Sequence, residues 1–221
     1  MSSRDLILGR VRRALADVPR DDTPYERAVR RDYLHEHGGL SPAETVELLA
    51  ENLADYRALV HRCDDARLPG LLARLLAERG SRTVLVPPGL PSSWLGAADA
   101  TPVRDRASST ADELDRVDSV VTGCALAVAE TGTLVLDGSA DQGRRRITLV
   151  PDHHICVVRV PEQVVSSVPQ ALARLDPARP LTWISGPSAT SDIELDRVEG
   201  VHGPRTLEVV LVTGGGDQGP G

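Results

Sequence analysis

"VVTGCALAVAETGTLVLDG", residues 120–138, is the stretch on which the interpretation of the fold depends. Apolar, β-branched runs at its two ends flank an alanine-rich middle, and Gly132 permits a sharp turn before the second run. We therefore expect a strand, a short helix over "CALAVAE" and a second strand. Glu130 is the one charge between these two strands. It is either a catalytic group, a binding group or a turn residue whose carboxylate is satisfied by the amides and hydroxyls that follow it.

Helical and strand patterns alternate on both sides of this stretch, from about residue 66 to the C-terminal end. Further strands are expected in "SRTVLVPPG", "HHICVVRV", "LTWISG" and "TLEVVLVTGG", and helices in "ARLPGLLARLLAERG", "STADELDRV", "PEQVVSSVPQALARL" and, as a short turn, "ATSDIELDRV". Continuously apolar strands that alternate with helices indicate a largely parallel sheet covered on both faces. In such sheets ligands bind in the loops beyond the carboxyl ends of the strands.

The residues before 66 have a helical pattern. "SSRDLILGRVRRALADV" predicts a first helix capped by Ser3, and "SPAETVELLAENLADYRALVHRC" predicts a second in which Ser41 and Glu44 form a capping box. Between them, residues 19–40 are polar and irregular, which indicates a linker or a docking segment. We therefore divide the chain into a helical extension over 1–65, an α/β domain over 66–213 and a disordered tail over 214–221.

Composition excludes several classes of function. The formal net charge is −7, and all 25 basic residues are arginine, so a Schiff-base or phosphate-loop lysine is excluded and a nucleic-acid-binding surface is disfavoured. Aromatic residues make up 2% of the chain, so the core must consist of aliphatic side chains. Three widely spaced cysteines without a CxxC motif favour a reducing cytoplasm and predict no metal, no iron–sulfur cluster and no other resident cofactor. No apolar run approaches the roughly 20 residues that a membrane span needs.

Cys124 and the histidines allow more than one interpretation. Cys124 follows a predicted strand, where it is either a thiol with a lowered pKa at a helix start or a small buried residue. His153 and His154 are adjacent on a predicted strand, so their side chains should point to opposite faces and not bind one metal together. His202, between glycine and proline, is the candidate general base by residue type, and a structural histidine is the alternative.

Two loops contain candidate ligand-binding groups. "ISGPSATSDIE" places hydroxyls and amides after a strand, as in an anion site, although Ser191 or Asp192 would also serve there simply as a cap. "DGSADQGRRR" supplies Arg144 to a possible carboxylate or phosphate, although a charge run is more often solvated. We assign no catalytic residue. The ligand-binding candidates are Glu130, Thr131, Arg144, His154, Ser185, Gly186, Ser188, Thr190, Asp192 and His202.

Several stretches together resemble a known family. "TGCALAVAETGTLVLDG", "GRRRITLVPDHHICVV", "LTWISGPSATSDIELDRVEGVHGPRTLEVVLV" and "ILGRVRRAL" are similar to the lactate utilisation protein C group of the LUD-domain family. The resemblance implies a Rossmann-like three-layer α/β sandwich of the ribose-5-phosphate isomerase and CoA-transferase type. It also implies a role in bacterial oxidation of L-lactate to pyruvate beside two iron–sulfur partner proteins.

Two functions follow from the resemblance. In the first, the chain is a subunit without a cluster of its own in a lactate-oxidising system, where it binds a small anion or organises partners. In the second, it is a free-standing enzyme on an acyl-CoA or phosphorylated substrate, with Glu130 as the candidate nucleophile by analogy with the CoA transferases. We expect Glu130 to be a positioning group because adjacent hydroxyls and amides can satisfy its carboxylate.

Overall fold

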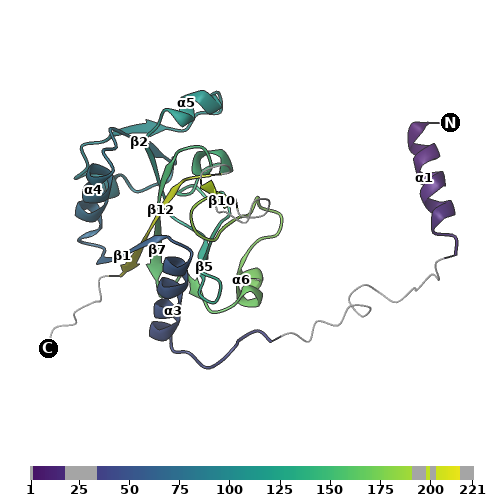
Figure 1. The fold of residues 1–221 in the computed structure, drawn as a ribbon, viewed down its shortest axis with the longest axis horizontal. Helices are drawn as coiled ribbons and strands as arrows, with labels where there is room; N and C mark the ends of the chain where they lie inside the picture. The colour runs from purple at the N-terminus through teal and green to yellow at the C-terminus, as the bar shows by residue number, and fades with distance from the viewer. Residues whose placement is uncertain (1, 18–33, 191–197, 200–202, 215–221) are drawn as a thin grey trace. The chain divides into compact units, whose positions relative to one another are not determined.

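The computed structural model describes residues 2–17, 34–190, 198–199 and 203–214, and the chain divides into two compact units, residues 1–34 and 35–221 (Figure 1). The first unit contains helix α1, Ser3–Ala14. Ser2, one residue before the predicted cap, closes its capping box: the Ser2 hydroxyl accepts from the amide of Asp5, and the Asp5 carboxylate accepts from the amide of Ser2. None of the residues of α1 is buried.

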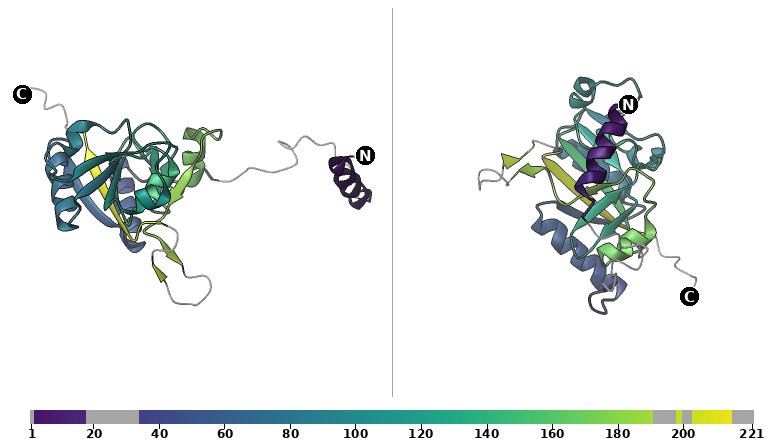
Figure 2. Two further views of the ribbon diagram at one scale, coloured as in Figure 1. Left: turned by 90° about the horizontal axis from the view of Figure 1, so that it is seen from above. Right: turned by 90° about the vertical axis from the view of Figure 1, so that its right-hand side faces the viewer.

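The second unit contains a parallel sheet of six strands in the order β1-β12-β7-β4-β2-β3. The strands are β1 (Leu59–Asp64), β2 (Thr83–Val86), β3 (Thr101–Arg104), β4 (Ser119–Thr122), β7 (His153–Val160) and β12 (Thr206–Thr213). Every neighbouring pair runs parallel, so the largely parallel sheet expected from the sequence is confirmed. Figure 2 shows this sheet in the middle of the unit.

Helices cover one face of the six-stranded sheet. Helix α4 (Leu68–Glu78) and the 3₁₀ turn η1 (Ser92–Leu95) pack their leucines and Trp94 on this face. The sheet meets them with the side chains of Val121, Ile155, Val157 and Val210. Gly80 has the positive φ of +73° expected of a glycine that ends a helix.

Helix α3 (Pro42–Asp55) and a second sheet cover the other face. This sheet has four strands in the order β8-β5-β6-β9, with bounds Val164–Val165, Leu126–Val128, Thr133–Leu136 and Thr182–Ile184. Helix α6 (Val168–Arg174) packs on the outer side of the second sheet through Ala171. The arrangement is a three-layer α/β sandwich, which confirms the predicted fold class.

Residues 120–138 connect the two sheets. The chain leaves the six-stranded sheet at the end of β4 and enters the four-stranded sheet at Leu126. The helix expected over "CALAVAE" is wrong, because this segment forms β5 and pairs with β6. Leu126 and Val128 face α6, whereas Ala127 and Ala129 face the core beneath the large sheet. Successive side chains of a strand point to opposite faces, so burial of both faces explains why the run is continuously apolar, and the alanines are small enough for the two sheets to approach each other.

The second predicted helix begins as expected and ends early. The Ser41 hydroxyl accepts from the amide of Glu44, and the Glu44 carboxylate accepts from the amide of Ser41, so the capping box is confirmed. The helix ends at Asp55, and Arg57 takes a positive φ of +67° that breaks the helical path. The chain then enters β1, because residues 59–64 pair with β12.

The remaining elements are short. Helix α5 (Ala111–Asp115) is capped by Thr110, and η2 (Arg145–Thr148) precedes β7. The helix expected over 161–175 begins only at Val168, after β8, where Ser167 caps it. The prediction of a helical turn at 189–198 is wrong at both of its ends. The two ends belong to the antiparallel strands β10 (Ala189–Thr190) and β11 (Val198–Glu199). Within the described part of the chain, every helix is too short or too polar to cross a bilayer.

Candidate functional site

A small cavity brings together four of the predicted site residues. His154, Ser185, Gly186 and Ser188 line a space of about 160 Å³, with Leu207 beside them. We call it the amino-end pocket, since His154 and Leu207 lie where β7 and β12 begin. The sequence predicted a site beyond the carboxyl ends of one parallel sheet. That placement is wrong for these residues, because β9 belongs to the second sheet and Pro204 precedes β12.

His154 is a buried, neutral group in the wall of this pocket. Its Nε2 lies 2.8 Å from Oγ1 of Thr122, and its side chain is almost fully buried. Burial, with a further contribution from His153, lowers the pKa of His154 to about 3. His153 contacts a different set of partners on the opposite face of β7, so the prediction that the two histidines diverge is confirmed.

A chain of hydroxyl groups leads from the ETGT turn to the pocket. Oγ1 of Thr131 lies 2.7 Å from Oγ1 of Thr133, which in turn lies 2.8 Å from Oγ of Ser185. At Gly186 φ is +82°, and a Cβ there would lie 2.4 Å from the carbonyl oxygen of Tyr56. The loop after β9 is therefore held against both β6 and the end of α3.

The chemistry of the amino-end pocket is that of neutral groups. Among the described residues that line it, the polar side-chain groups are hydroxyls, the imidazole of His154 and the indole N–H of Trp183, and none is an arginine or a carboxylate. Because His154 stays unprotonated near neutral pH, this wall offers hydrogen bonds but no cation to a ligand. The described part of the pocket suits a small uncharged group better than the anion expected from the sequence.

Glu130 lies apart from the residues that line this pocket. Its Oε1 is 2.9 Å from Nδ1 of His37, and its backbone amide donates to the carbonyl of Ser166. The sequence predicted that hydroxyls and amides of its own turn would satisfy the carboxylate. The contact is instead made by a residue from the polar segment 19–40, whose role the sequence left open.

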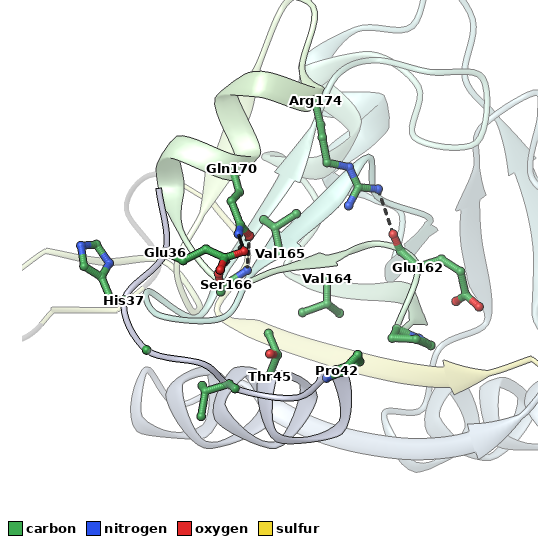
Figure 3. A pocket seen from close by; sticks show the side chains of 13 residues that line it. Glu36, His37, Pro42, Thr45, Glu162, Val164, Val165, Ser166, Gln170 and Arg174 are labelled. Carbon is green, nitrogen blue, oxygen red and sulfur yellow. Dashed lines mark hydrogen bonds between the residues drawn. The ribbon is translucent and has the colours of Figure 1, made fainter. Parts of the chain in front are cut away.

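The end of that polar segment is fixed to the second sheet and α6. The Ser167 hydroxyl donates to the carbonyl of His35, and Nε2 of Gln170 donates to Oε1 of Glu36 at 2.7 Å. Residues 36–42 then form one wall of a groove of about 360 Å³ (Figure 3). Glu36, Gln170 and Ser166 point toward one another there, while Arg174 donates to the carbonyl of Glu162. These polar groups bind one another, so the groove offers few groups to a ligand.

Each of the three consecutive arginines binds a distant segment of the chain. Arg144 makes a two-pronged contact with the carboxylate of Asp105, in which its Nε lies 2.7 Å from Oδ2. Arg145 donates to the carbonyl of Leu181, and Arg146 to the carbonyl of Ser109. The candidate role of Arg144 as an anion ligand therefore competes with an existing ion pair.

The other candidates are placed only in part. Thr190 belongs to β10, and Ser188 is fixed by its backbone amide, which donates to the carbonyl of Pro204 at 2.8 Å. Asp192 and His202 lie outside the described residues. The suggestion of a helix-start thiol at Cys124 is wrong. Cys124 is buried, and a hydrogen bond with Cys156 together with burial raises its pKa well above the usual value.

A buried polar network crosses the amino-terminal half of the large sheet on the side of α4. His61 Nε2 lies 2.6 Å from Glu208 Oε2, His153 Nε2 lies 2.9 Å from Glu208 Oε1, and His153 Nδ1 lies 2.7 Å from Ser119 Oγ. Burial would raise the pKa of Glu208, but the hydrogen bonds from the two histidines lower it overall. The serine, histidine and glutamate have the order of a catalytic triad. However, Ser119 is fully buried, so no substrate reaches its hydroxyl.

Sequence reasoning overlooked this network. One signal was present, since Glu208 is the only charge within the apolar strand "TLEVVLV" and a buried carboxylate needs partners. Across the described ranges, no three His, Cys, Asp or Glu side chains lie close enough together to hold a metal ion.

These features define a class of protein: a three-layer α/β sandwich with a parallel six-stranded sheet and a second sheet inserted after its β4. A family model for the LUD domain matches residues 46–212, so the chain belongs to the LUD domain family.

Similar proteins agree with this assignment. Lactate utilization protein C of Deinococcus radiodurans is 49% identical over 78% of this chain and 82% of its own length. Lactate utilization protein C of an Exiguobacterium species is 32% identical over 83% of this chain and 86% of its own. The crystal structure of a DUF162 family protein from Deinococcus radiodurans is 43% identical and superposes with a TM-score of 0.66, over 79% of this chain and 99% of that one.

Proposed function

We propose that this chain takes part in the bacterial utilisation of lactate. The observation that carries the proposal is the 49% identity, over most of both chains, to a protein named lactate utilization protein C. The matched region includes all of the residues that line the amino-end pocket, since the family model extends from α3 to β12.

In its finer form, the proposal is that the chain is a subunit of a system that oxidises L-lactate to pyruvate with two iron–sulfur partner proteins. The chain itself would carry no cluster. Cys156 is buried on β7, Cys124 is buried in the connection between β4 and β5, and Cys63 is half-buried on β1, so the three thiols do not share one exposed loop. We place the protein in the cytoplasm, where such thiols stay reduced.

Growth on lactate tests the proposal. The gene for this chain should restore growth on L-lactate as sole carbon source to a bacterial strain that lacks its own lactate utilisation protein C. The same strain should grow equally well on pyruvate with or without the gene. Failure of the wild-type chain to restore growth on lactate, when the chain is shown to accumulate in folded form, would contradict the proposal.

Partner binding tests the finer form. Affinity-purified chain from cells grown on lactate should retain two proteins whose absorption and iron content are those of iron–sulfur proteins. The control is the same purification from cells grown on pyruvate with the chain expressed at an equal level. If the chain is purified alone from both cultures while growth on lactate is restored, the coarser role stands and the subunit arrangement does not.

The alternative is a free-standing enzyme in which Glu130 forms an acyl intermediate. A nucleophilic carboxylate needs an open approach. The carboxylate of Glu130 is instead three-quarters covered and contacts His37, which supports a positioning role. Incubation with acyl-CoA donors followed by hydroxylamine trapping and intact mass measurement separates the two. We expect no adduct in the wild-type chain, and an adduct at Glu130 that disappears in Glu130→Gln would favour the enzyme.

A further inference from the structure

Another cavity, larger than the amino-end pocket, lies at the opposite end of the six-stranded sheet from that pocket. In the order β1-β12-β7-β4-β2-β3, strands β2 and β4 are neighbours. The next strand after β2 is β3, on one side of this pair, whereas the next strand of this sheet after β4 is β7, on the other side, so the order of the strands changes direction between β2 and β4. The crevice outside the carboxyl ends at such a change of direction is where open α/β sheets bind ligands. A cavity of about 450 Å³ occupies this place, lined by Gly89 after β2, Gly123 after β4, and Arg159 near the end of β7.

A neighbouring cavity of about 360 Å³ shares Ser139, Asp141 and Gln163 with the first. We call the two together the switch cleft. Their summed size is in the range of natural small-molecule sites.

Tight backbone packing fixes Asp141 in the cleft. The amide of Gly123 donates to the carbonyl of Asp141 at 3.1 Å, and the amide of Gly89 donates to the carbonyl of Ala140 at 2.8 Å. A Cβ on Gly123 would lie 2.2 Å from Oδ2 of Asp141. The loop of residues 139–142 therefore lies directly on the ends of β2 and β4, and only glycine leaves room for this carboxylate.

Most other polar side chains of the cleft already form hydrogen bonds within the protein. Gln163 accepts from the amide of Arg159 and donates to the carbonyl of Cys124, both at 2.7 Å. The hydroxyl of Ser139 donates to the carboxylate of Asp137 at 2.6 Å. The carboxylate of Asp141 is half-buried, and this burial raises its pKa overall; hydrogen bonds from its own backbone amide and from the Gln142 side chain lower the pKa, while the nearby charge of Asp137 raises it further.

Arg159 is the cation of the larger of the two cavities. Its guanidinium lies over the ring of Trp94, 5.9 Å from the centroid, and its Nη1 donates to Oδ1 of Asp65 at 2.9 Å. A guanidinium has five N–H donors in a planar fork, so these contacts orient it and leave donors for a ligand carboxylate. The cleft thus has one cation oriented by Trp94 and Asp65, and one carboxylate that is held against the backbone; its other arginine, Arg174, donates to the carbonyl of Glu162, and its other carboxylate, Asp137, pairs with Arg179.

We propose that the switch cleft binds a small 2-hydroxycarboxylate, with Arg159 holding the ligand carboxylate and Asp141 accepting a hydrogen bond from the ligand hydroxyl. This inference rests on the proposed role in lactate utilisation, which favours a hydroxy acid over other ligands that carry both an anion and a hydrogen-bond donor. It places the ligand at the end of the sheet opposite to the amino-end pocket, whose described walls contain no cation.

Calorimetric titration of the full chain with three acids of equal carbon number tests the assignment. L-Lactate has the hydroxyl donor, pyruvate has a carbonyl in its place, and propionate has neither. L-Lactate should bind at least about tenfold more tightly than propionate, a difference of about 1.4 kcal/mol. Pyruvate should bind like propionate, because a carbonyl cannot donate to Asp141.

Substitutions then separate the two contacts. Asp141→Ala should remove the preference for L-lactate over propionate, while Arg159→Gln should weaken the binding of all three acids. Gly123→Ala should act like Asp141→Ala, because the added methyl displaces the carboxylate; if this variant does not fold, Asp141→Ala alone carries the test. Asp152→Ala and Arg62→Gln, which alter exposed ion pairs elsewhere, are the matched controls and should bind like the wild type.

The outcomes distinguish this inference from the proposed function. If the wild-type gene restores growth on lactate but the chain binds no L-lactate at millimolar concentrations, or binds it equally well without Asp141, the cleft assignment is wrong and the role in lactate utilisation stands. If growth is not restored, the role is wrong whatever the chain binds. A preference for L-lactate that depends on both Asp141 and Arg159 supports the assignment.

Discussion

The two ends of the six-stranded sheet use their acidic residues in opposite ways. At the amino-terminal half, Glu208 receives hydrogen bonds from His61 and His153, and this pairing lowers its pKa. At the carboxyl end, Asp141 is held by the chain over Gly123, and its half-buried position raises its pKa. Glu208 has two histidines as hydrogen-bond partners, whereas Asp141 has no partner of equal strength.

This difference indicates which end is built for stability and which for binding. Buried polar groups that satisfy one another fix the core, as Ser81, Ser119, His153, Glu208 and His61 do. A carboxylate held in a less favourable place costs some stability and is a common property of ligand sites. The following substitutions should therefore have opposite effects at the two ends.

The largest effect is expected at Glu208. Glu208→Ala leaves His61 and the buried His153 without their common acceptor, so the free energy of unfolding should fall by about 3 kcal/mol. Urea unfolding followed by circular dichroism measures the change. Asp152→Ala, which breaks an exposed pair with Arg205, is the control and should change stability by less than about 0.5 kcal/mol. A loss below about 1 kcal/mol in Glu208→Ala would show that the network is not stabilising.

A second effect depends on His154 and pH. Its pKa is about 3 in the folded chain and about 6.5 when unfolded, so the unfolded state binds the extra proton between these values. Its contribution to stability is therefore full above about pH 6.5 and declines as the pH falls toward 3; about 2 kcal/mol should be lost between pH 7 and pH 5.

His154→Gln, which keeps a polar group near Thr122, should remove this part of the acid sensitivity. The measurement is the free energy of unfolding from urea titrations at pH 7 and pH 5 for both proteins. An identical pH dependence in the variant would mean that other groups cause it.

The smallest effect, of opposite sign, is expected at Asp141. Its folded pKa is raised, so the ionised form is disfavoured by folding at neutral pH. Asp141→Asn removes the charge and should raise the free energy of unfolding by about 0.5 kcal/mol at pH 7, a small gain because the group is half exposed. The gain should vanish as the pH falls below the unfolded pKa of aspartate. A loss of stability in Asp141→Asn would remove the contrast between the two ends of the sheet.

Much of the fold could be predicted from local patterns. The capping box of α3 and the strands β2, β4, β7 and β12 of the large sheet depend on residues close in sequence, and both were predicted correctly, whereas β3 was not predicted. Strand β5 was missed because seven alanine-rich residues fit a helix by propensity, and only the pairing with β6 and β8 makes them a strand. Strand β1 was missed for the same reason, since its partner β12 lies about 150 residues further along the chain.

The candidate site was less predictable than the fold. Hydroxyls after β9 and the imidazole of His154 were identified by residue type, and the structure brings them to one pocket. The sequence did not indicate that His37 would reach Glu130 from a segment without clear secondary structure. Asp141 in "DGSADQGRRR" was not identified as a site residue, although it lies three residues before the arginines. No local sequence pattern indicates which side chain of a polar loop faces a cavity.

The passage of the chain from one sheet to the other has a consequence for folding. Within 18 residues, from Ser119 to Leu136, the chain supplies one strand to the six-stranded sheet and two to the four-stranded sheet. The same short segment therefore takes part in both hydrogen-bonded sheets, and a strand that leaves one sheet pulls on a neighbouring strand that is fixed in the other. Native-state hydrogen exchange should find both sheets in one cooperative unit, with the amides of β4 and β6 exchanging at the same free energy of opening.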